Sequence, residues 1–285
     1  MQIKSYPLAR IFSGDKTIPN PILNRLGIQV LRMLAARAMY RILPASIDER
    51  VESYVKEIKR EGIIMIHDFL PSDAFEAVRQ EYKRIADNPT SWNVFARGCN
   101  TQQLAFINSL DPAIIPNAST YFFKNPIIHG IFSAMEKSAL QDLRVTMAFE
   151  RLIQGSDGKH DPETKFNSDI FFNTHKAWLY LDDVTPEHGP LAYVKRSHIH
   201  SPRQLIAVYK DSCKKNEGSR RIPAEEIARR GLVETLCVCP KNTLVVANTF
   251  GYHRRVQGKA PMERIAAQIA VRVHSPFQLL LRSRS

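Results

Sequence analysis

The chain has 285 residues and carries 40 Lys and Arg against 28 Asp and Glu, a formal net charge of +12. With 44% hydrophobic and 24% charged residues, it is not a disordered, collagen-like or disulfide-scaffold protein. It lacks the run of about 18 uncharged apolar residues that a membrane span needs. The four cysteines form no C-x-x-C pair, which argues against zinc or disulfide frameworks and favours a reducing, cytoplasmic location.

The positive charge is concentrated in two segments. Residues 1–43 hold seven basic residues and one acidic residue, and residues 195–230 hold ten basic and four acidic residues, so each segment contributes +6. The rest of the chain is neutral. Such segments attract phosphates, carboxylates, anionic lipid headgroups or nucleic acid. The chain contains no RNP-like motif or zinc-finger spacing, which argues against nucleic acid.

The N-terminal region reads as an irregular arm over residues 1–21 followed by one helix over residues 22–43, ending before Pro44. Apolar residues lie nearly all round this helix, with four arginines among them. One interpretation is a helix buried against its own domain with arginine stems reaching water. The other is an interfacial helix that makes peripheral membrane contact, or a lid over an apolar substrate.

The next elements are a strand at 63–66 and a helix marked by Phe75, Val78, Tyr82 and Ile85, whose spacing defines one helical face. Residues 88–118 read as loop and residues 126–140 as a helix. Strands then follow at 143–153, 177–181, 191–194, 232–238, 244–246 and 264–273, with a short helix at 223–230. Several short strands at close spacing predict a β-sandwich or barrel.

The domain organisation expected from this pattern is an N-terminal arm and helix, residues 1–60, packed on a core of residues 61–285. The core contains the basic insert 195–230. We expect these parts to form one unit, because no internal repeat or low-complexity linker separates them.

Two blocks, residues 166–198 and 243–264, carry a family resemblance. The strongest part is the run Lys-Ala-Trp-Leu-Tyr-Leu-Asp-Asp-Val at 176–184, which continues through Gly189 and Pro190 to Ser197 and His198. Over about residues 61–275 the chain resembles the phytanoyl-CoA dioxygenase family of Fe(II)- and 2-oxoglutarate-dependent oxygenases. The resemblance implies a mainly β fold with flanking helices, built on a double-stranded β-helix, or jelly roll.

The resemblance also implies a site. Its members hold iron with a His-x-Asp pair and a distal histidine, a ligand set that leaves open positions for 2-oxoglutarate and dioxygen. The Asp of the pair falls on Asp169 and the distal histidine on His253. Arg264, eleven residues later, falls where the family anchors the far carboxylate of 2-oxoglutarate through a charge-assisted contact.

The most serious departure from the family pattern is Asn167, which stands where the first histidine is expected. An amide oxygen is a harder and weaker ligand than a neutral imidazole, so iron binding should weaken. Four explanations remain open. Asn167 ligates through its side-chain oxygen, water fills the position, a nearby histidine such as His175 replaces it, or the protein is no longer an oxygenase.

Two functions follow from this reading. The first is an Fe(II)/2-oxoglutarate-dependent dioxygenase that hydroxylates an anionic or lipid-linked small molecule, with the basic segments flanking the mouth of its pocket. The alternative is a catalytically impaired or non-catalytic jelly roll that binds a ligand and has lost normal iron binding through Asn167.

Overall fold

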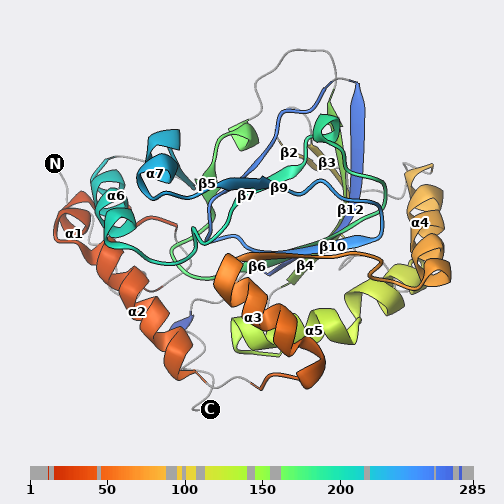
Figure 1. Cartoon of the computed structure of the whole chain (residues 1–285), viewed down its shortest axis with the longest axis horizontal. Coiled ribbons are helices and arrows are strands. Elements are labelled where there is room, and N and C mark those ends of the chain that lie inside the picture. The colour runs from red at the N-terminus through yellow and green to blue at the C-terminus, as the bar shows by residue number, and fades with distance from the viewer. Residues whose placement is uncertain are drawn as a thin grey trace.

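Two antiparallel sheets face each other, and helices cover their outer sides (Figure 1). The computed structural model describes residue 12 and residues 16–43, 46–87, 95–97, 101–106, 113–139, 145–154, 162–214, 219–259, 261–271 and 276–277. Between the sheets lies a core of apolar side chains that includes Trp178, Tyr180 and Tyr193. This architecture confirms the expected jelly roll with flanking helices.

The large sheet has seven strands, and its centre is long and almost fully buried. In spatial order the strands are β1 (Ile63–Ile66), β10 (Thr243–Asn248), β6 (His175–Tyr180), β12 (Met262–Val271), β4 (Val145–Gln154), β3 (Thr101–Phe106) and β2 (Phe95–Arg97). All six residues of β10 are buried, which is why its run of apolar residues shows no alternation.

The small sheet has five short strands and carries the candidate site. In spatial order they are β8 (Arg220–Arg221), β5 (Asn167–Ser168), β11 (His253–Arg255), β7 (Leu191–Val194) and β9 (Glu234–Leu236). Short strands of this kind leave few apolar positions to count, and β5, β8 and β11 are absent from the strands expected above.

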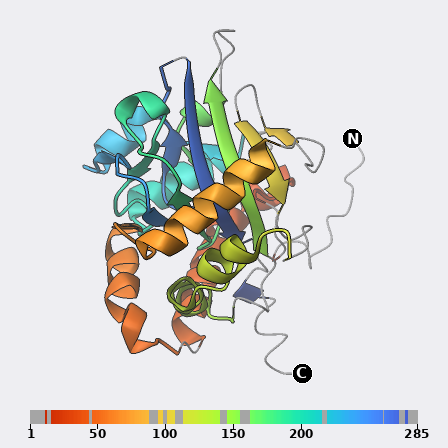
Figure 2. The ribbon, with the colours of Figure 1, turned by 90° about the vertical axis from the view of Figure 1, so that its right-hand side faces the viewer.

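Helices pack on the outer face of the large sheet and bury its second core. They are α3 (Glu52–Glu61), α4 (Ser72–Ala86) and α5 (Pro126–Glu136), with η2 (Glu49–Val51) and η5 (Ala118–Phe123) beside them. Figure 2 shows α4 crossing the long strands β4 and β12. The predicted face of α4 is confirmed, since Phe75, Val78, Tyr82 and Ile85 are all buried in this core.

Other short elements connect the strands or cover the small sheet. These are η7 (Pro162–Thr164), η8 (Pro186–His188), α6 (Pro202–Ser212) and α7 (Ala224–Arg229). Both α6 and α7 lie in the basic insert. Ser201 caps α6 by accepting a hydrogen bond from the backbone N–H of Gln204 at 3.2 Å.

The N-terminal helical segment is two helices, not one: α1 (Pro21–Arg25) and α2 (Ile28–Ile42). Gly27 separates them in the left-handed conformation, with φ of 78°, which glycine adopts without steric cost. The expected end before Pro44 is confirmed. Helix α3 runs across residue 60, where we placed the boundary between the N-terminal part and the core. That division of the chain stays a prediction.

Three further expectations differ in detail. The region 88–118 contains β2 and β3, while its residues 88–94, 98–100 and 107–112 lie outside the described residues. Helix α5 ends at Glu136 and not at 140, because Lys137 takes a left-handed conformation with φ of 61°. The strand expected at 232–238 is the shorter β9.

No helix among the described residues is long and apolar enough to cross a membrane.

Candidate active site

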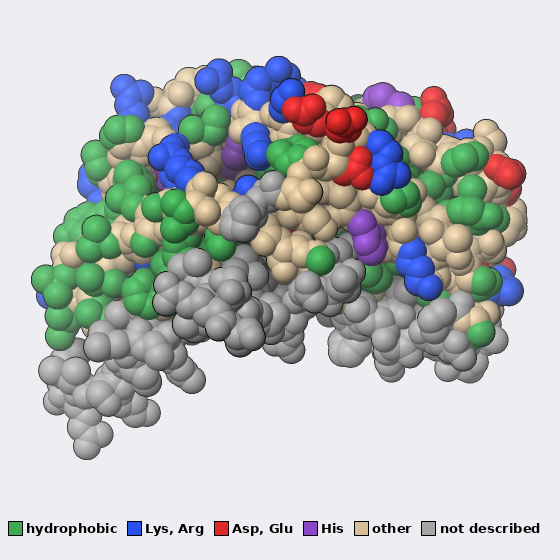
Figure 3. Space-filling view, turned by 90° about the horizontal axis from the view of Figure 1, so that it is seen from below, with side chains coloured by type: hydrophobic (Ala, Val, Ile, Leu, Met, Phe, Trp, Pro, Cys, Tyr) green, Lys and Arg blue, Asp and Glu red, His purple; other side chains and the backbone are tan. Residues whose placement is uncertain are grey.

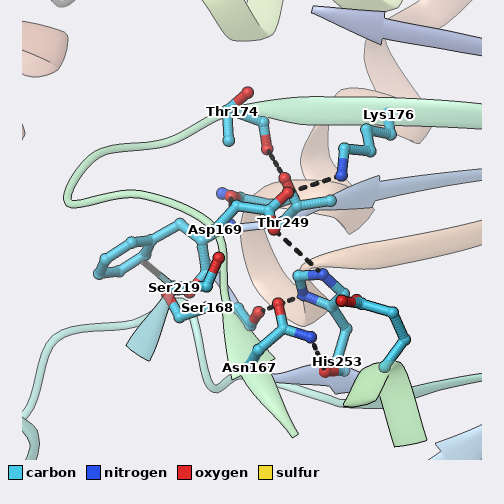
Figure 4. A network of polar contacts seen from close by, with 12 residues as sticks. Asn167, Ser168, Asp169, Thr174, Lys176, Ser219, Thr249 and His253 are labelled. Atoms are coloured by element: carbon cyan, nitrogen blue, oxygen red, sulfur yellow. Dashed lines mark hydrogen bonds and ion pairs between the residues drawn. The ribbon is translucent and has the colours of Figure 1, made fainter. Parts of the chain in front are cut away.

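Strands β5 and β11 bring the first two candidate residues together. Asn167 and His253 are partners in the antiparallel ladder, and the amide Nδ2 of Asn167 donates to the backbone oxygen of His253 at 3.2 Å. Figure 4 shows both side chains beside Asp169. Asn167 is buried, and its nitrogen is committed to the strand pair. Its side-chain oxygen is therefore the atom left to contact a cation.

The imidazole of His253 is held in one tautomer by the backbone. Its Nδ1 lies 2.9 Å from the carbonyl oxygen of Gly251, and a carbonyl only accepts, so Nδ1 carries the proton. In the neutral ring, Nε2 then presents its lone pair. Nε2 lies 3.6 Å from Oδ1 of Asp169. Two lone-pair atoms that face each other at this distance suit a cation between them.

Asp169 is fixed from both its backbone and its side chain. Its N–H donates to the carbonyl oxygen of Thr249 at 3.0 Å, and its Oδ2 accepts from Nζ of Lys176 at 2.6 Å. Burial alone would raise the pKa of Asp169, but the Lys176 ammonium and His253 outweigh it and hold that pKa well below its usual value. Asp169 is therefore a carboxylate at neutral pH.

Lys176 is a site residue that the sequence reasoning missed. It lies on β6 with the same parity as Trp178 and Tyr180, which belong to the core between the sheets, so its side chain faces the site. The available signal was a single charge within an otherwise apolar, aromatic strand. Such a charge needs a partner, and the partner is Asp169.

His175 does not replace the missing histidine, so that explanation for Asn167 is wrong. It is the first residue of β6, and neighbouring residues of a strand face opposite sides. Its Nδ1 lies 2.7 Å from Oε1 of Glu136 on α5, and both side chains are buried. His175 therefore joins the helical layer to the sheet, on the face away from Asp169.

Arg264 lies on β12 and faces the space between the sheets, as Ala266 does. It is buried, donates through Nη1 to the carbonyl oxygen of Gly189, and lies over the ring of Tyr180 at 5.6 Å. Among the described residues, no hydrogen bond or ion pair joins Arg264 to Asp169 or His253. The structure thus places a buried interior cation here that is not hydrogen-bonded or ion-paired to these two residues.

Tyr193 and Gly251 shape the floor of the site. Tyr193 is the ladder partner of His253 on β7, and its hydroxyl donates to the carbonyl oxygen of Asn248 at 2.9 Å. A Cβ at position 251 would overlap that hydroxyl. Gly251 is therefore required for the close approach that also directs its carbonyl oxygen at the imidazole of His253.

A cavity of about 1020 Å³ adjoins the site, and Asp169 forms part of its wall. Both basic segments reach it, as expected: Lys16 donates to Oγ of Ser219 at 2.5 Å across the cavity wall. Six cationic and three acidic side chains line it, together with an apolar wall. The cations are Lys16, Lys165, Lys214, Arg220, Arg221 and Arg254, and the acids are Asp169, Asp211 and Glu234.

The basic insert is tied to the site strand by a buried network. Arg220 binds Asp211 through Nε at 2.7 Å and forms a two-pronged ion pair with Glu226 on α7. The hydroxyl of Tyr252, the residue before His253, donates to the same carboxylate at 2.5 Å. Arg220 therefore stabilises the entry to β11, whereas Arg221 is exposed.

The donor set fits a divalent iron ion through two strong ligands. A neutral imidazole and a carboxylate are both common iron ligands, and they converge here with their lone pairs opposed. Among the described residues, no group of three His, Cys, Asp or Glu side chains gathers to hold a metal. Within the part of the chain that the structure describes, the third protein position is therefore left to the amide oxygen of Asn167 or to water.

Comparison with solved structures shows which proteins share this fold. The chain is similar to the iron-bound EctD from S. alaskensis, with 15% identity, 83% of this chain and 84% of that chain covered, and a TM-score of 0.52. It is also similar to the epimerase SnoN in complex with Fe3+, alpha ketoglutarate and nogalamycin RO, with 13% identity, 78% and 82% covered, and a TM-score of 0.52.

The carbocyclase SnoK from nogalamycin biosynthesis is similar at 16% identity, with 80% of this chain and 86% of that chain covered and a TM-score of 0.50. No curated protein matches the chain. The model of the phytanoyl-CoA dioxygenase (PhyH) family matches residues 58–234, more than half of the chain, including Asn167, Asp169 and Lys176. The chain belongs to the phytanoyl-CoA dioxygenase family.

Proposed function

We propose that the protein is an Fe(II)/2-oxoglutarate-dependent oxygenase that acts on an anionic small molecule. The observation that carries this proposal is the opposed pair His253 Nε2 and Asp169 Oδ1, 3.6 Å apart at the wall of a cation-lined cavity. Membership of a dioxygenase family supports it. Two proteins of the same fold, EctD and SnoN, were solved with iron bound.

In this proposal His253 and Asp169 hold the metal, with Asn167 through its amide oxygen or with water. Iron(II) and 2-oxoglutarate, when bound, would supply the activation of dioxygen that oxidises a substrate C–H bond. The protein's own residues position these groups. The carbonyl oxygen of Gly251 holds the proton of the neutral His253 ring on Nδ1, which leaves Nε2 for the metal, and Lys176 occupies Oδ2 of Asp169, which leaves Oδ1 for the metal.

Arg264 is the proposed anchor for the far carboxylate of 2-oxoglutarate. It is a buried guanidinium on the interior face of β12, and a buried cation of this kind favours an anionic partner. Its present partner is a neutral carbonyl, that of Gly189. A carboxylate would make a stronger charge-assisted contact than that carbonyl does.

The class of substrate follows from the cavity. Lys16 lies in the cavity wall, where partial desolvation lowers its pKa, as do Lys176 and Arg221, against the opposing effect of Asp169 and Glu163. Positive charges gathered in one cavity favour the binding of an anionic ligand. The apolar part of the wall, Met33, Phe171, Val208 and Phe250 among others, accommodates a hydrocarbon portion.

A second candidate function is ligand binding without catalysis. The observation that favours it is the ion pair between Lys176 and Asp169 at 2.6 Å, which satisfies half of the carboxylate without a metal. With Asn167 in place of a histidine, the protein would then keep the cavity and its charge as a binding site only.

An anaerobic titration with iron(II) and 2-oxoglutarate tests the two functions, because the iron chelate has a visible charge-transfer band. A band in both the wild type and Asn167→His supports an active site that tolerates the amide. A band only in Asn167→His supports the non-catalytic protein. Absence of the band in both contradicts the oxygenase proposal.

The anionic substrate class has its own test, with inorganic pyrophosphate as the probe and isothermal titration calorimetry as the measurement. Lys16→Gln and Arg221→Gln should each weaken pyrophosphate binding about fivefold or more, as loss of a charged contact does. The matched control is Lys56→Gln, an exposed lysine on α3. Equal affinity in all four proteins contradicts an anionic ligand in this cavity.

A further inference from the structure

Helix α2 presents apolar side chains to solvent, although it also buries apolar side chains, and two of its polar side chains are buried against the protein. Leu31 is 57%, Leu34 38% and Ile42 71% exposed, whereas Gln29 is 4% and Arg32 1% exposed. With Ala38, the exposed residues follow spacings of 3, 4 and 4 along the helix, which is one continuous helical face. The inner face of α2 buries Met33, Ala36, Met39 and Tyr40, and the outer face carries apolar residues where a helix at a protein surface ordinarily carries polar ones.

Two buried polar side chains on the inner face of α2 fix which side of the helix points toward the protein. Arg32 donates to the carbonyl oxygen of Lys16 at 3.0 Å and stacks over the ring of Phe171 at 3.8 Å. Gln29 accepts from the N–H of Ile18 at 3.2 Å and donates to the oxygen of Lys16. These buried bonds fix the rotation of α2, so the apolar face stays outside.

The exposed apolar surface continues onto two neighbouring helices. Ile22 of α1 and Leu26, which directly follows that helix, are 50% and 68% exposed. Ile206 and Tyr209 of α6 are 56% and 39% exposed. The hydroxyl of Tyr209 donates to the carbonyl oxygen of Arg25 at 3.0 Å, which joins α6 to α1. Figure 3 shows hydrophobic side chains gathered on the left of the view, with basic side chains among them.

We refer to this surface as the α1–α2–α6 face. It comprises Ile22, Leu26, Leu31, Leu34, Ile42, Ile206 and Tyr209. An exposed apolar surface of this extent marks an interaction site.

The basic residues beside this face indicate what kind of surface binds to it. Residues 16–43 contain five basic residues and no Asp or Glu. Arg25 and Arg41 are exposed at the two ends of the helical pair, and Lys210 is exposed on α6. Apolar side chains flanked by cations are the pattern of a surface that lies on an anionic bilayer. A second copy of this chain would place arginines against arginines, which is unfavourable.

We propose that the α1–α2–α6 face docks on an anionic membrane surface, with its leucines at the headgroup boundary. Helix α2 has 15 residues, too few for the about 20 that a spanning helix needs, so it would lie in the plane of the interface. Since α2 and α6 also wall the cavity through Met33 and Val208, the face would bring the cavity close to the lipid. If the proposed function holds, its substrate is then an anionic lipid or a lipid-linked anion.

Vesicle co-sedimentation of the full chain tests this proposal without iron, 2-oxoglutarate or substrate, so its outcome is independent of the proposed function. The probes are vesicles of phosphatidylcholine alone and of phosphatidylcholine mixed with phosphatidylglycerol. We expect the partition coefficient to be at least about tenfold higher on the mixed vesicles, and to fall as salt is added.

Two pairs of variants locate the contact. Leu31→Ser/Leu34→Ser should lose about tenfold or more in partitioning, whereas Val233→Ser, at a side chain 75% exposed outside this face, should lose nothing. Arg41→Glu should lose at least about fivefold, and Lys83→Glu, exposed on α4, should match the wild type. Thermal melting checks that each variant folds.

Hydrogen exchange of the wild type is the measurement that needs no variant. The amides of residues 22–42 and 202–212 should exchange more slowly on mixed vesicles than in solution or with neutral vesicles. Equal binding to both vesicle types, no binding, or protection elsewhere overturns the proposal. A dimer in vesicle-free solution that Leu31→Ser/Leu34→Ser disperses also overturns it, because the occupant is then a second copy.

Discussion

Asn167 and His253 face each other across the β5–β11 ladder, and the side chain of the first donates to the backbone of the second at 3.2 Å. The residue that stands where the family resemblance implies a first histidine is therefore a ladder partner of His253, the proposed metal ligand. Its amide nitrogen stabilises the strand that carries His253. Restoring a histidine would add a ligand and remove this hydrogen bond at the same time.

Asn167→His should therefore bind iron(II) about tenfold or more tightly than the wild type, because a neutral imidazole is the better iron ligand. The measurement is an anaerobic titration followed by the charge-transfer band of the 2-oxoglutarate chelate. Asn167→Ala is the control, since it removes the amide and adds no ligand. If Asn167→His binds no more tightly than Asn167→Ala, the position is not directed at the metal.

Lys176→Met should also tighten iron binding, by about fivefold or more, because it removes a positive charge that lies 2.6 Å from Asp169 and repels a divalent cation. Methionine keeps most of the side-chain volume. Lys165→Met, at an exposed cation of the cavity wall, serves as the matched control. Weaker iron binding in Lys176→Met would show instead that the lysine orients the carboxylate for the metal.

Arg264→Gln should weaken 2-oxoglutarate binding to the metal-loaded protein by about tenfold or more, the loss expected for one charge-assisted hydrogen bond. Calorimetry measures it, and iron affinity should stay unchanged. Arg264→Lys should recover part of the loss, since it keeps the charge but not the two-pronged geometry. Unchanged 2-oxoglutarate affinity in Arg264→Gln would assign this arginine to the fold, through Gly189 and Tyr180.

His198 should make stability depend on pH. Burial lowers its pKa to about 4; its Nε2 donates to the carbonyl oxygen of Lys59, and its buried Nδ1 has no partner. As the pH falls below about 6.5, His198 takes up a proton in the unfolded chain but not in the folded protein, so the free energy of unfolding decreases. The decrease reaches up to about 3 kcal/mol and levels off near the pKa of the folded state.

The measurement is urea unfolding at a series of pH values between these limits. His198→Gln keeps a donor for the oxygen of Lys59 but cannot titrate, so its curve should be flatter than that of the wild type. Two parallel curves would mean that other groups cause the pH dependence.

Gly251→Ala should lower the free energy of unfolding by about 1–3 kcal/mol, the usual cost of overpacking, because its Cβ overlaps the Tyr193 hydroxyl. It should also weaken iron binding, since the carbonyl oxygen of residue 251 sets the tautomer of His253. Gly231→Ala is the control: nothing lies within 4 Å of its added Cβ, and its left-handed backbone costs about 1 kcal/mol. Iron affinity equal to that of the wild type would separate Gly251 from the site.

The long helices and strands, and the positions of Asp169 and His253 along the chain, can be predicted from the sequence. The contacts between the site residues cannot. The face of α4 and the buried strands of the large sheet follow from periodicity, and Asp169 and His253 converge as the family pattern implies. Strands β5 and β11 have two and three residues, too few to show a period, yet they hold the site. Lys176 lies seven residues from Asp169, and only the bend of the chain between them brings the two charges into contact.

The N-terminal helices show the same limit. Counting apolar residues around 22–43 finds a helix that is apolar on most sides, and this pattern alone does not say which side faces water. The answer depends on Lys16 and Ile18, whose backbone groups bind Arg32 and Gln29. Those contacts join residues before the helix to two polar side chains on its buried face, and the periodicity of the helix sequence does not reveal them.

The network around Arg220 reduces the number of cations in the basic insert that are available to a binding anion. Arg220 is bound by Glu226 and Asp211, so its charge is largely neutralised inside the molecule. The guanidinium of Arg230 is held by the carbonyl oxygens of Ser197 and Ile199. The arginines and lysines left facing solvent are fewer than the formal count of the insert. Counterions released when an anion binds will number fewer than that count, and the salt dependence of binding will be correspondingly shallow.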